Sequence, residues 1–280
     1  MSITSPHHVQ SFRPLPSRSS PVTDMPDVLP ATENPFGGIL PQADSLDADP
    51  ERFAQRLQHS IDTWREGGYR VVWLEVPIER AALIPVAVTA GFGFHHSNVE
   101  YLMLTLQLEQ GAFVPAYSTH YIGAGGVAIN DRDELLVVRE RYHRDPKRPP
   151  RFKLPGGALH QGEHLADGVV REVLEETGVH TRFDALVCFR HWHGYRHGKS
   201  DIYFVCRLKP LSEEITIEAE EIAESRWMPV QEYLDAEQVS GFNKQIVLAA
   251  RNSPGFASTD IADHDDKSRF EFFRPLLEDS

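Results

Sequence analysis

One stretch of the sequence, residues 156–179 (GGALHQGEHLADGVVREVLEETGV), constrains the fold of this chain more than any other. On an α-helix, Glu172, Glu175 and Glu176 stand at positions i, i+3 and i+4, so their carboxylates fall within about 100° of one face. The neighbouring face is apolar and suited to packing on a sheet, and Gly178 supplies a C-terminal stop. The stretch therefore predicts an amphipathic helix with a sheet on one side and acidic groups on the other.

The acidic face has two interpretations. Neighbouring glutamates are commonly just solvated, but three carboxylates without lysine partners at i+4 repel one another and cost stability. A hard divalent cation turns that repulsion into binding, because Mg²⁺ and Mn²⁺ prefer oxygen ligands. Arg171 can brace a carboxylate from the side, and the Gly-Gly pair before the helix lets the loop fold back sharply. We therefore predict a metal site from Glu172, Glu175, Glu176 and a backbone carbonyl near Gly156.

The same stretch resembles the Nudix family. Gly157, then Glu163 after five residues, then REVLEETGV (171–179) after seven more, match every fixed position of the Nudix box. The resemblance implies an α/β/α sandwich with a mixed sheet. It also implies an enzyme that uses Mg²⁺ or Mn²⁺ to hydrolyse a nucleoside diphosphate linked to another moiety.

Residues 60–250 resemble a narrower Nudix group that includes plant ADP-ribose/NADH pyrophosphatases and an animal relative. In that group the N-terminal module is similar to part of an acetyltransferase fold, without that activity. The resemblance implies cleavage of ADP-ribose, NADH or both to AMP and a phosphorylated second product. The sequence does not rank these substrates against FAD, CoA or capped RNA, because the loop 191–200 (HWHGYRHGKS) departs from the group.

The resemblance also assigns roles to single residues. Glu172 is the first choice as general base, and Arg171 orients the helix carboxylates. Glu163 holds the loop structure, and Glu221 aligns with a glutamate that adds a ligand or a base. The alternative for Glu221 is a solvated position in the acidic run EAEEIAE.

Three basic residues of one loop are candidates for binding substrate. Arg196, His197 and Lys199 follow a predicted strand and can touch phosphate or ribose, although an ordinary surface loop explains them equally well. His191 and His193 point the same way along that strand, which is typical of a zinc site. The sequence shows no third ligand at a suitable spacing.

The composition divides the chain into four segments. Residues 1–48 are rich in Ser and Pro and lack apolar periodicity, so we expect a disordered leader. Residues 49–112 predict a small α/β module, in which Phe53, Leu57, Ile61 and Trp64 recur at helical spacing. Residues 117–252 predict the Nudix domain. Residues 253–280 predict a loose acidic tail, in which RFEFFRPLL is able to dock.

Charge and hydropathy exclude some classes of protein. With 28 basic and 41 acidic residues the net charge is −13, which argues against a nucleic-acid partner and suits a protein that attracts cations. A small-molecule nucleotide substrate is what the resemblance implies. No apolar run approaches the roughly 18 residues of a membrane span, so we expect a cytoplasmic enzyme. Three alternatives stay open: a nucleotide-binding or regulatory protein with weak catalysis, a bacterial effector exported to act on host nucleotides, and a homodimeric assembly.

Overall fold

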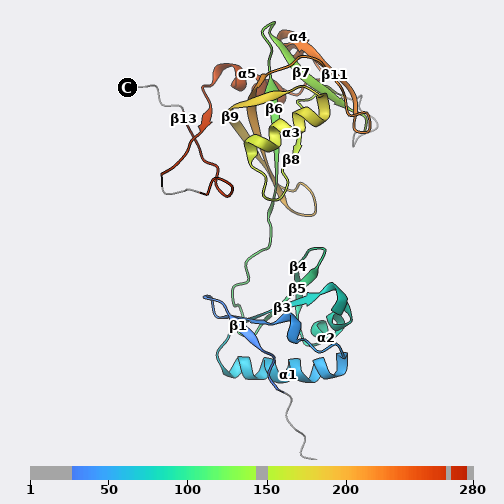
Figure 1. The fold of residues 1–280 in the computed structure, drawn as a ribbon, viewed down its shortest axis with the longest axis vertical. Helices are drawn as coiled ribbons and strands as arrows, with labels where there is room; N and C mark the ends of the chain where they lie inside the picture. Colours follow the sequence, from blue (N-terminus) through green and yellow to red (C-terminus); the bar gives the residue numbers. More distant parts are fainter. Residues whose placement is uncertain (1–26, 143–150, 263–265, 276–280) are drawn as a thin grey trace, which may run out of the picture. The chain divides into compact units, whose positions relative to one another are not determined.

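The computed structural model describes residues 27–142, 151–262 and 266–275. The chain divides into two compact units, Met1–Tyr117 and Ser118–Ser280, which are drawn in blue to green and in green to red in Figure 1. The first 26 residues of the predicted leader and the last five of the predicted tail lie outside the described residues. Within the described residues, no helix is both long and apolar enough to cross a membrane.

The first unit is a five-stranded sheet packed against helices. Its strands pair antiparallel, apart from the parallel pair of β2 and β3. In spatial order the strands are β1 (Ala31–Glu33), β2 (Gly38–Pro41), β3 (Val71–Pro77), β5 (Tyr101–Gln107) and β4 (Gly93–Ser97). The helices are η1 (Ala43–Ser45), α1 (Pro50–Glu66), η2 (Ile78–Leu83) and α2 (Ile84–Thr89).

Helix α1 forms where the apolar spacing predicts it. The side chain of Asp49 accepts a hydrogen bond from the backbone N–H of Arg52 at 2.8 Å, and Pro50 fills the first helical position. The four apolar residues of the predicted stripe are all buried and form one cluster with β3. This stripe fixes α1 on the sheet, and the Gly67-Gly68 pair ends the helix.

The predicted boundary of the leader at residue 48 does not hold. Residues 27–48 contribute β1, β2 and η1, and Leu29, Ile39 and Leu46 are at most 4% exposed in the core of the first unit. The backbone N–H of Leu29 also donates to the buried hydroxyl of Ser60 at 2.9 Å. These elements are three or four residues long, so they show no periodicity, and tertiary packing rather than local propensity stabilises them.

The second unit contains a six-stranded mixed sheet and a separate two-stranded sheet. Strands β10 and β6 run parallel, and the remaining pairs are antiparallel, which confirms the mixed sheet. The larger sheet has the order β13 (Phe273–Pro275), β12 (Phe256–Ser258), β9 (Thr181–Trp192), β10 (Ser200–Pro210), β6 (His120–Ala128) and β8 (Gly156–Ala158). The smaller sheet pairs β11 (Ile222–Pro229) with β7 (Glu134–Glu140).

Helices cover both faces of these sheets. One core cluster joins α3 (Leu165–Thr177) to alternate residues of β6, among them Ala124 and Ala128. The other joins α4 (Val230–Asp235) and α5 (Gly241–Asn252) to the opposite face through Val127. Because strand side chains alternate between faces, this division places the strands between two helical layers, as an α/β/α sandwich requires.

The prediction of a loose tail is wrong for the described part of residues 253–280. Strand β12 pairs with β9, and β13 pairs with β12, so the tail extends the larger sheet. The ring of Phe273 packs 5.6 Å from that of Phe183. The docking of RFEFFRPLL, which the sequence left open, occurs within its described residues 269–275 through the pairing of β13, the ring of Phe273 and polar contacts to α3. The acidic composition of the tail concealed it.

Candidate active site

The glutamate-rich stretch forms helix α3, as predicted. Val169 and Val173 are fully buried against the sheet. The helix ends at Gly178 in the left-handed conformation, with φ of 70°, where a Cβ atom would lie 2.9 Å from Thr216. The end of α3 therefore requires glycine for both conformation and space.

The guanidinium of Arg171 lies among three carboxylates. Its Nε and Nη2 donate to Glu163 at 2.6 and 2.9 Å, and its Nη1 donates to Glu172 at 3.0 Å and to Glu175 at 2.8 Å. The hydrogen bonds from Arg171 lower the pKa of Glu163 to about 2. The Glu163 carboxylate also accepts from the backbone N–H of His160, so it ties the loop before α3 to the helix.

Glu176 occupies a different environment, at the buried edge of α3. It is 8% exposed, and its Oε2 accepts a hydrogen bond from the backbone N–H of Gly156 at 2.8 Å. Burial raises the pKa of Glu176, although the charge of Lys153, at 3.6 Å, and the Gly156 hydrogen bond oppose that rise. Lys153 also pairs with Glu140 at 2.7 Å. Sequence analysis missed Lys153 and Glu140, because only the pairing of residue 153 with Val138 of β7 brings them beside α3.

The Gly-Gly pair brings the backbone of β8 against both α3 and β6. Gly156 has φ of 145°, and a Cβ atom there would lie 2.2 Å from the carbonyl oxygen of Ala124. A Cβ atom on Gly157 would lie 2.4 Å from Oε2 of Glu172. Only glycine allows this approach of backbone to carboxylate. In this conformation Gly156 presents its N–H to Glu176, while a role for its carbonyl as a metal ligand stays a prediction.

Glu221 stands apart from the α3 carboxylates. It is exposed just before β11, and its backbone carbonyl accepts from the N–H of Arg141 at 2.7 Å. Within the described residues, no hydrogen bond or ion pair joins its carboxylate to α3. The next residue, Ile222, pairs with Glu140 at the end of β7, and Glu140 forms the ion pair with Lys153. The backbone of Glu221 therefore lies beside that end of β7.

The three basic candidates lie in the loop between β9 and β10. Lys199 places its Nζ 5.4 Å from the centre of the Tyr121 ring, and Arg196 stacks over Tyr195 at 5.2 Å. His197 adopts a positive φ of 50°. The loop therefore presents cations next to aromatic rings rather than beside the α3 carboxylates.

A second arginine, which sequence analysis missed, lies among aromatic rings beside that loop. Arg190 of β9 forms an ion pair with the buried Asp201 at 2.5 Å. Its guanidinium lies 5.2 Å from the ring of Trp192, 5.4 Å from that of Tyr203 and 5.8 Å from that of Phe242. Its Nε is buried and has no hydrogen-bond partner among the described residues. The alternation of Arg190 and Trp192 along β9 is the pattern from which sequence analysis could have found this arginine.

Tyr203 connects the two groups of residues. Burial raises the pKa of its hydroxyl strongly, and the nearby charge of Glu176 adds to the rise. A Cβ atom on Gly156 would lie 2.9 Å from this hydroxyl, so the phenol reaches the loop that contacts Glu176. A surface of aromatic rings and arginine, centred on Arg190, therefore adjoins the glutamate cluster.

Comparison with known proteins identifies the family. A family model described as "Nudix hydrolase domain" matches residues 29–108, and one described as "NUDIX domain" matches residues 119–249. "Nudix hydrolase 2" of Arabidopsis thaliana is 36% identical over 254 residues, which cover 90% of this chain and 87% of that protein. The chain belongs to the Nudix hydrolase family.

Two further relatives show how far the likeness extends. "Nudix hydrolase 8" of Arabidopsis thaliana is 39% identical over 216 residues, 76% of this chain, although the match spans only 58% of that protein. "Nucleoside diphosphate-linked moiety X motif 6" of Homo sapiens is 35% identical over 236 residues, 81% of this chain and 73% of that protein. Family membership makes this Nudix protein a hydrolase of nucleoside diphosphate-linked moieties, as the motif predicted.

Nudix enzymes generally need a divalent metal ion, and the residues of α3 fit one by their chemistry. Five glutamates, at positions 140, 163, 172, 175 and 176, share the two cations Lys153 and Arg171. A dication would offset this excess of negative charge and the burial cost at Glu176. In this conformation, however, Arg171 engages Glu172 and Glu175. No three His, Cys, Asp or Glu side chains of the described residues are arranged as a ready ligand set.

The histidines considered for zinc have a partner that the sequence did not suggest. Nε2 of His191 lies 2.9 Å from Nε2 of His120 on β6, and the ring of His193 lies 4.3 Å from that of His191. These three imidazoles are likewise not arranged to hold a metal ion, within the part of the chain that the structure describes. The zinc site is therefore not supported.

Proposed function

We propose that this Nudix hydrolase cleaves the diphosphate of ADP-ribose, NADH or both, to give AMP and a phosphorylated second product. The observation that carries the proposal is the contact between the buried end of the glutamate cluster and the Arg190 surface, through Tyr203 and Gly156. A dinucleotide-like substrate needs both surfaces, since its diphosphate requires positive charge and its bases require stacking partners.

The metal would be held by Glu172, Glu175 and Glu176, with a backbone carbonyl near Gly156. When bound, Mg²⁺ or Mn²⁺ neutralises the diphosphate and polarises the phosphorus under attack. Arg171 orients Glu172 and Glu175, as its hydrogen bonds at 3.0 and 2.8 Å support. Glu172 takes the proton of the attacking water, a role that the resemblance to the Nudix box supports. Its carboxylate lies against the backbone of β8 at Gly157. Glu221 serves as a further ligand or base if its segment closes on the cluster.

The rest of the substrate is assigned to β9 and the loop that follows it. The guanidinium of Arg190, whose side chain is 31% exposed, lies beside the rings of Trp192 and Tyr203. Arg196, His197 and Lys199 of the loop contact phosphate or ribose. Cations flanked by aromatic rings suit a nucleotide, because the rings take the base while the cations take the phosphates.

Four assignments rest on resemblance or composition and are proposals of the same kind. They are an acetyltransferase-like fold without that activity for the N-terminal module, a homodimer, a cytoplasmic location, and a non-catalytic role for residues before 27. Export of an effector into a host is the alternative for location, and a reporter fused to residues 1–48 separates the two.

A substrate panel tests the proposal. ADP-ribose, NADH, FAD, CoA and capped RNA are incubated with Mg²⁺ or Mn²⁺, and the products are identified. We expect AMP with ribose 5-phosphate from ADP-ribose, and AMP with reduced nicotinamide mononucleotide from NADH. Inorganic phosphate or free nicotinamide as the primary product would contradict the proposal, as would turnover that survives chelation of all divalent metal. Tight binding without turnover would instead favour a regulatory protein.

A further inference from the structure

The first turn of α3 lacks a cap from its own sequence. His164 occupies the N-cap position, and its side chain makes no capping hydrogen bond. The first backbone N–H groups of a helix have no partner within the helix, so an uncapped start that is partly buried needs acceptors from elsewhere. Leu165, at the start of α3, is 7% exposed.

Glu271, more than one hundred residues away in sequence, supplies those acceptors. Its Oε2 accepts from the N–H of Leu165 at 2.7 Å, and its Oε1 accepts from the N–H of Ala166 at 3.1 Å. The side chain is 14% exposed, so solvent competes little for it. A carboxylate at this end of a helix also interacts favourably with the helix dipole.

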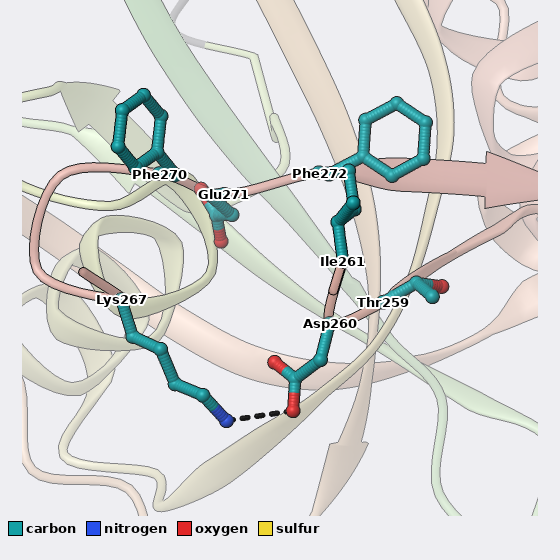
Figure 2. Close-up of a pocket in the computed structure, with 7 residues that line it drawn as sticks. All are labelled: Thr259, Asp260, Ile261, Lys267, Phe270, Glu271 and Phe272. Carbon is teal, nitrogen blue, oxygen red and sulfur yellow. Dashed lines mark hydrogen bonds and ion pairs between the residues drawn. The ribbon is translucent and has the colours of Figure 1, made fainter. Parts of the chain in front are cut away.

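Glu271 belongs to a segment that braces itself, here named the C-terminal strap (residues 256–262 and 266–275). The strap surrounds a pocket of about 190 Å³ whose lining side chains all come from the strap. Figure 2 shows Lys267 reaching toward Asp260 at one side of this pocket, where the two form an ion pair at 2.6 Å. The strap is anchored to the sheet by the pairing of Phe256 with Leu186 and to the helix by His164, whose Nε2 donates to the carbonyl of Lys267 at 2.7 Å.

The strap reaches the glutamate cluster through a short series of contacts. It holds His164 and Leu165, and the residue before His164 is Glu163. The carboxylate of Glu163 accepts two hydrogen bonds from Arg171, and Arg171 in turn donates to Glu172 and Glu175. Displacement of the first turn of α3 therefore moves the group that orients two of the helix carboxylates.

We propose that Glu271 is a positioning residue of the Nudix reaction, which caps α3 and so keeps Glu163 and Arg171 in the arrangement that aligns Glu172 and Glu175. In one respect the inference rests on the proposed function, namely that these carboxylates hold the metal. The capping contact itself does not depend on that function, and it can be measured without substrate or metal.

The test compares three variants of the full chain. Glu271→Ala removes both acceptor oxygens, Glu271→Gln keeps one, and Asp260→Asn disrupts the ion pair of the strap without touching α3. Four quantities are measured: hydrogen–deuterium exchange of residues 165–172, kcat, KM for the nucleotide, and the Mn²⁺ concentration for half-maximal turnover. Temperature is kept well below the melting point of each variant.

In Glu271→Ala we expect exchange in the first turn of α3 to rise about fivefold, the factor that corresponds to a typical cap. We also expect kcat to fall and the half-maximal Mn²⁺ concentration to rise, while KM stays within about twofold, because the Arg190 surface is untouched. Glu271→Gln should recover part of each change, and Asp260→Asn should match the wild type.

Unchanged exchange in Glu271→Ala would overturn the inference whether or not the enzyme turns over ADP-ribose. Faster exchange with unchanged kcat and unchanged Mn²⁺ dependence would also overturn it, because the cap would then be purely structural. The proposed function fails separately, through the wild-type enzyme and its products.

Discussion

The two units of this Nudix hydrolase differ in what they bury. Among the described residues, Ser60 is the one buried polar side chain of the first unit, and it bonds to the backbone of the same unit. The second unit buries Asn130, Glu176, Thr177, Thr181 and Asp201. Buried polar groups cost free energy unless they are paired. Four of these five residues have hydrogen-bond or ion-pair partners, and Glu176 and Asp201 are the two that lie at the candidate site.

The glycines of the two units show the same contrast. A Cβ atom on Gly93 of β4 would meet nothing within 4 Å, and Gly68 serves only to turn the chain at positive φ. In the second unit, Gly156 and Gly157 lie against the backbone of β6 and the carboxylate of Glu172. The first unit also has one close approach, at Gly38, where a Cβ atom would lie 2.3 Å from the side-chain amide of Asn34. That contact is with a neighbouring side chain of the same turn, whereas the second unit brings backbone against a carboxylate of the candidate site.

The largest expected effect is on turnover in Glu172→Gln. The substitution keeps the shape of the side chain but removes its charge and its ability to accept a proton. We expect kcat to fall by about 10²–10⁴, the usual contribution of a positioned proton acceptor. Stability without metal should change little, because the relieved repulsion from Glu175 and Glu176 offsets the lost ion pair with Arg171 at 3.0 Å.

The matched change in the first unit is Glu79→Gln, at an exposed position of η2. It should leave turnover and stability at wild-type levels. Steady-state kinetics and urea denaturation of both variants check the comparison. A folded Glu172→Gln enzyme with wild-type kcat would remove Glu172 from the mechanism and transfer its role to Glu176 or Glu221.

Gly157→Ala should give a smaller loss. The new Cβ would collide with the end of the Glu172 side chain, which can move aside, so the protein should fold with a stability loss of about 1–3 kcal/mol. The displaced carboxylate should nevertheless cost about 10² in kcat, because catalysis is sensitive to small misplacements. Gly93→Ala, where space is open, is the control and should not change kcat. Equal kinetics in the two variants would show that the approach of β8 to Glu172 is incidental.

The smallest expected effect is a pH dependence. The pKa of Glu163 is lowered from 4.5 to about 2 by Arg171, so this pair contributes stability above about pH 4.5 that is lost as pH falls toward about 2. Arg171→Gln should therefore lose less stability than the wild type between about pH 5 and pH 3 in urea denaturation. The control is Arg70→Gln, which breaks the half-exposed ion pair with Glu109. It should lose as much stability as the wild type over the same pH range. An unaltered pH dependence in Arg171→Gln would show that the Glu163 pair adds nothing.

The sequence predicted the elements whose pattern lies within one continuous stretch of residues. The apolar stripe of α1 and the complete α3 stretch, with its glycine stop, specify their elements locally. The strands at residues 31–41 and 256–275 escaped prediction, because each is three or four residues long and is stabilised only by pairing with a distant strand.

The candidate site divides in the same way. The motif placed Arg171 and the three glutamates on one helix, and the structure brings the guanidinium to Glu172 and Glu175. Pairing between separate strands brings three further residues to the site: Glu140, Lys153 and Arg190. The C-terminal strap brings a fourth, Glu271. No spacing in the sequence encodes such contacts, so sequence analysis did not find them.

The central claim, that the second unit binds a divalent cation through the carboxylates of α3, is tested most directly by thermal unfolding with and without Mn²⁺. A ligand that binds only the folded state stabilises it by about 2.7 kcal/mol at one hundred times its Kd. The account predicts that Mn²⁺ stabilises the wild type and Glu79→Gln equally and stabilises Glu172→Gln much less. Equal stabilisation of all three proteins, or none of the wild type at saturating Mn²⁺, would contradict it.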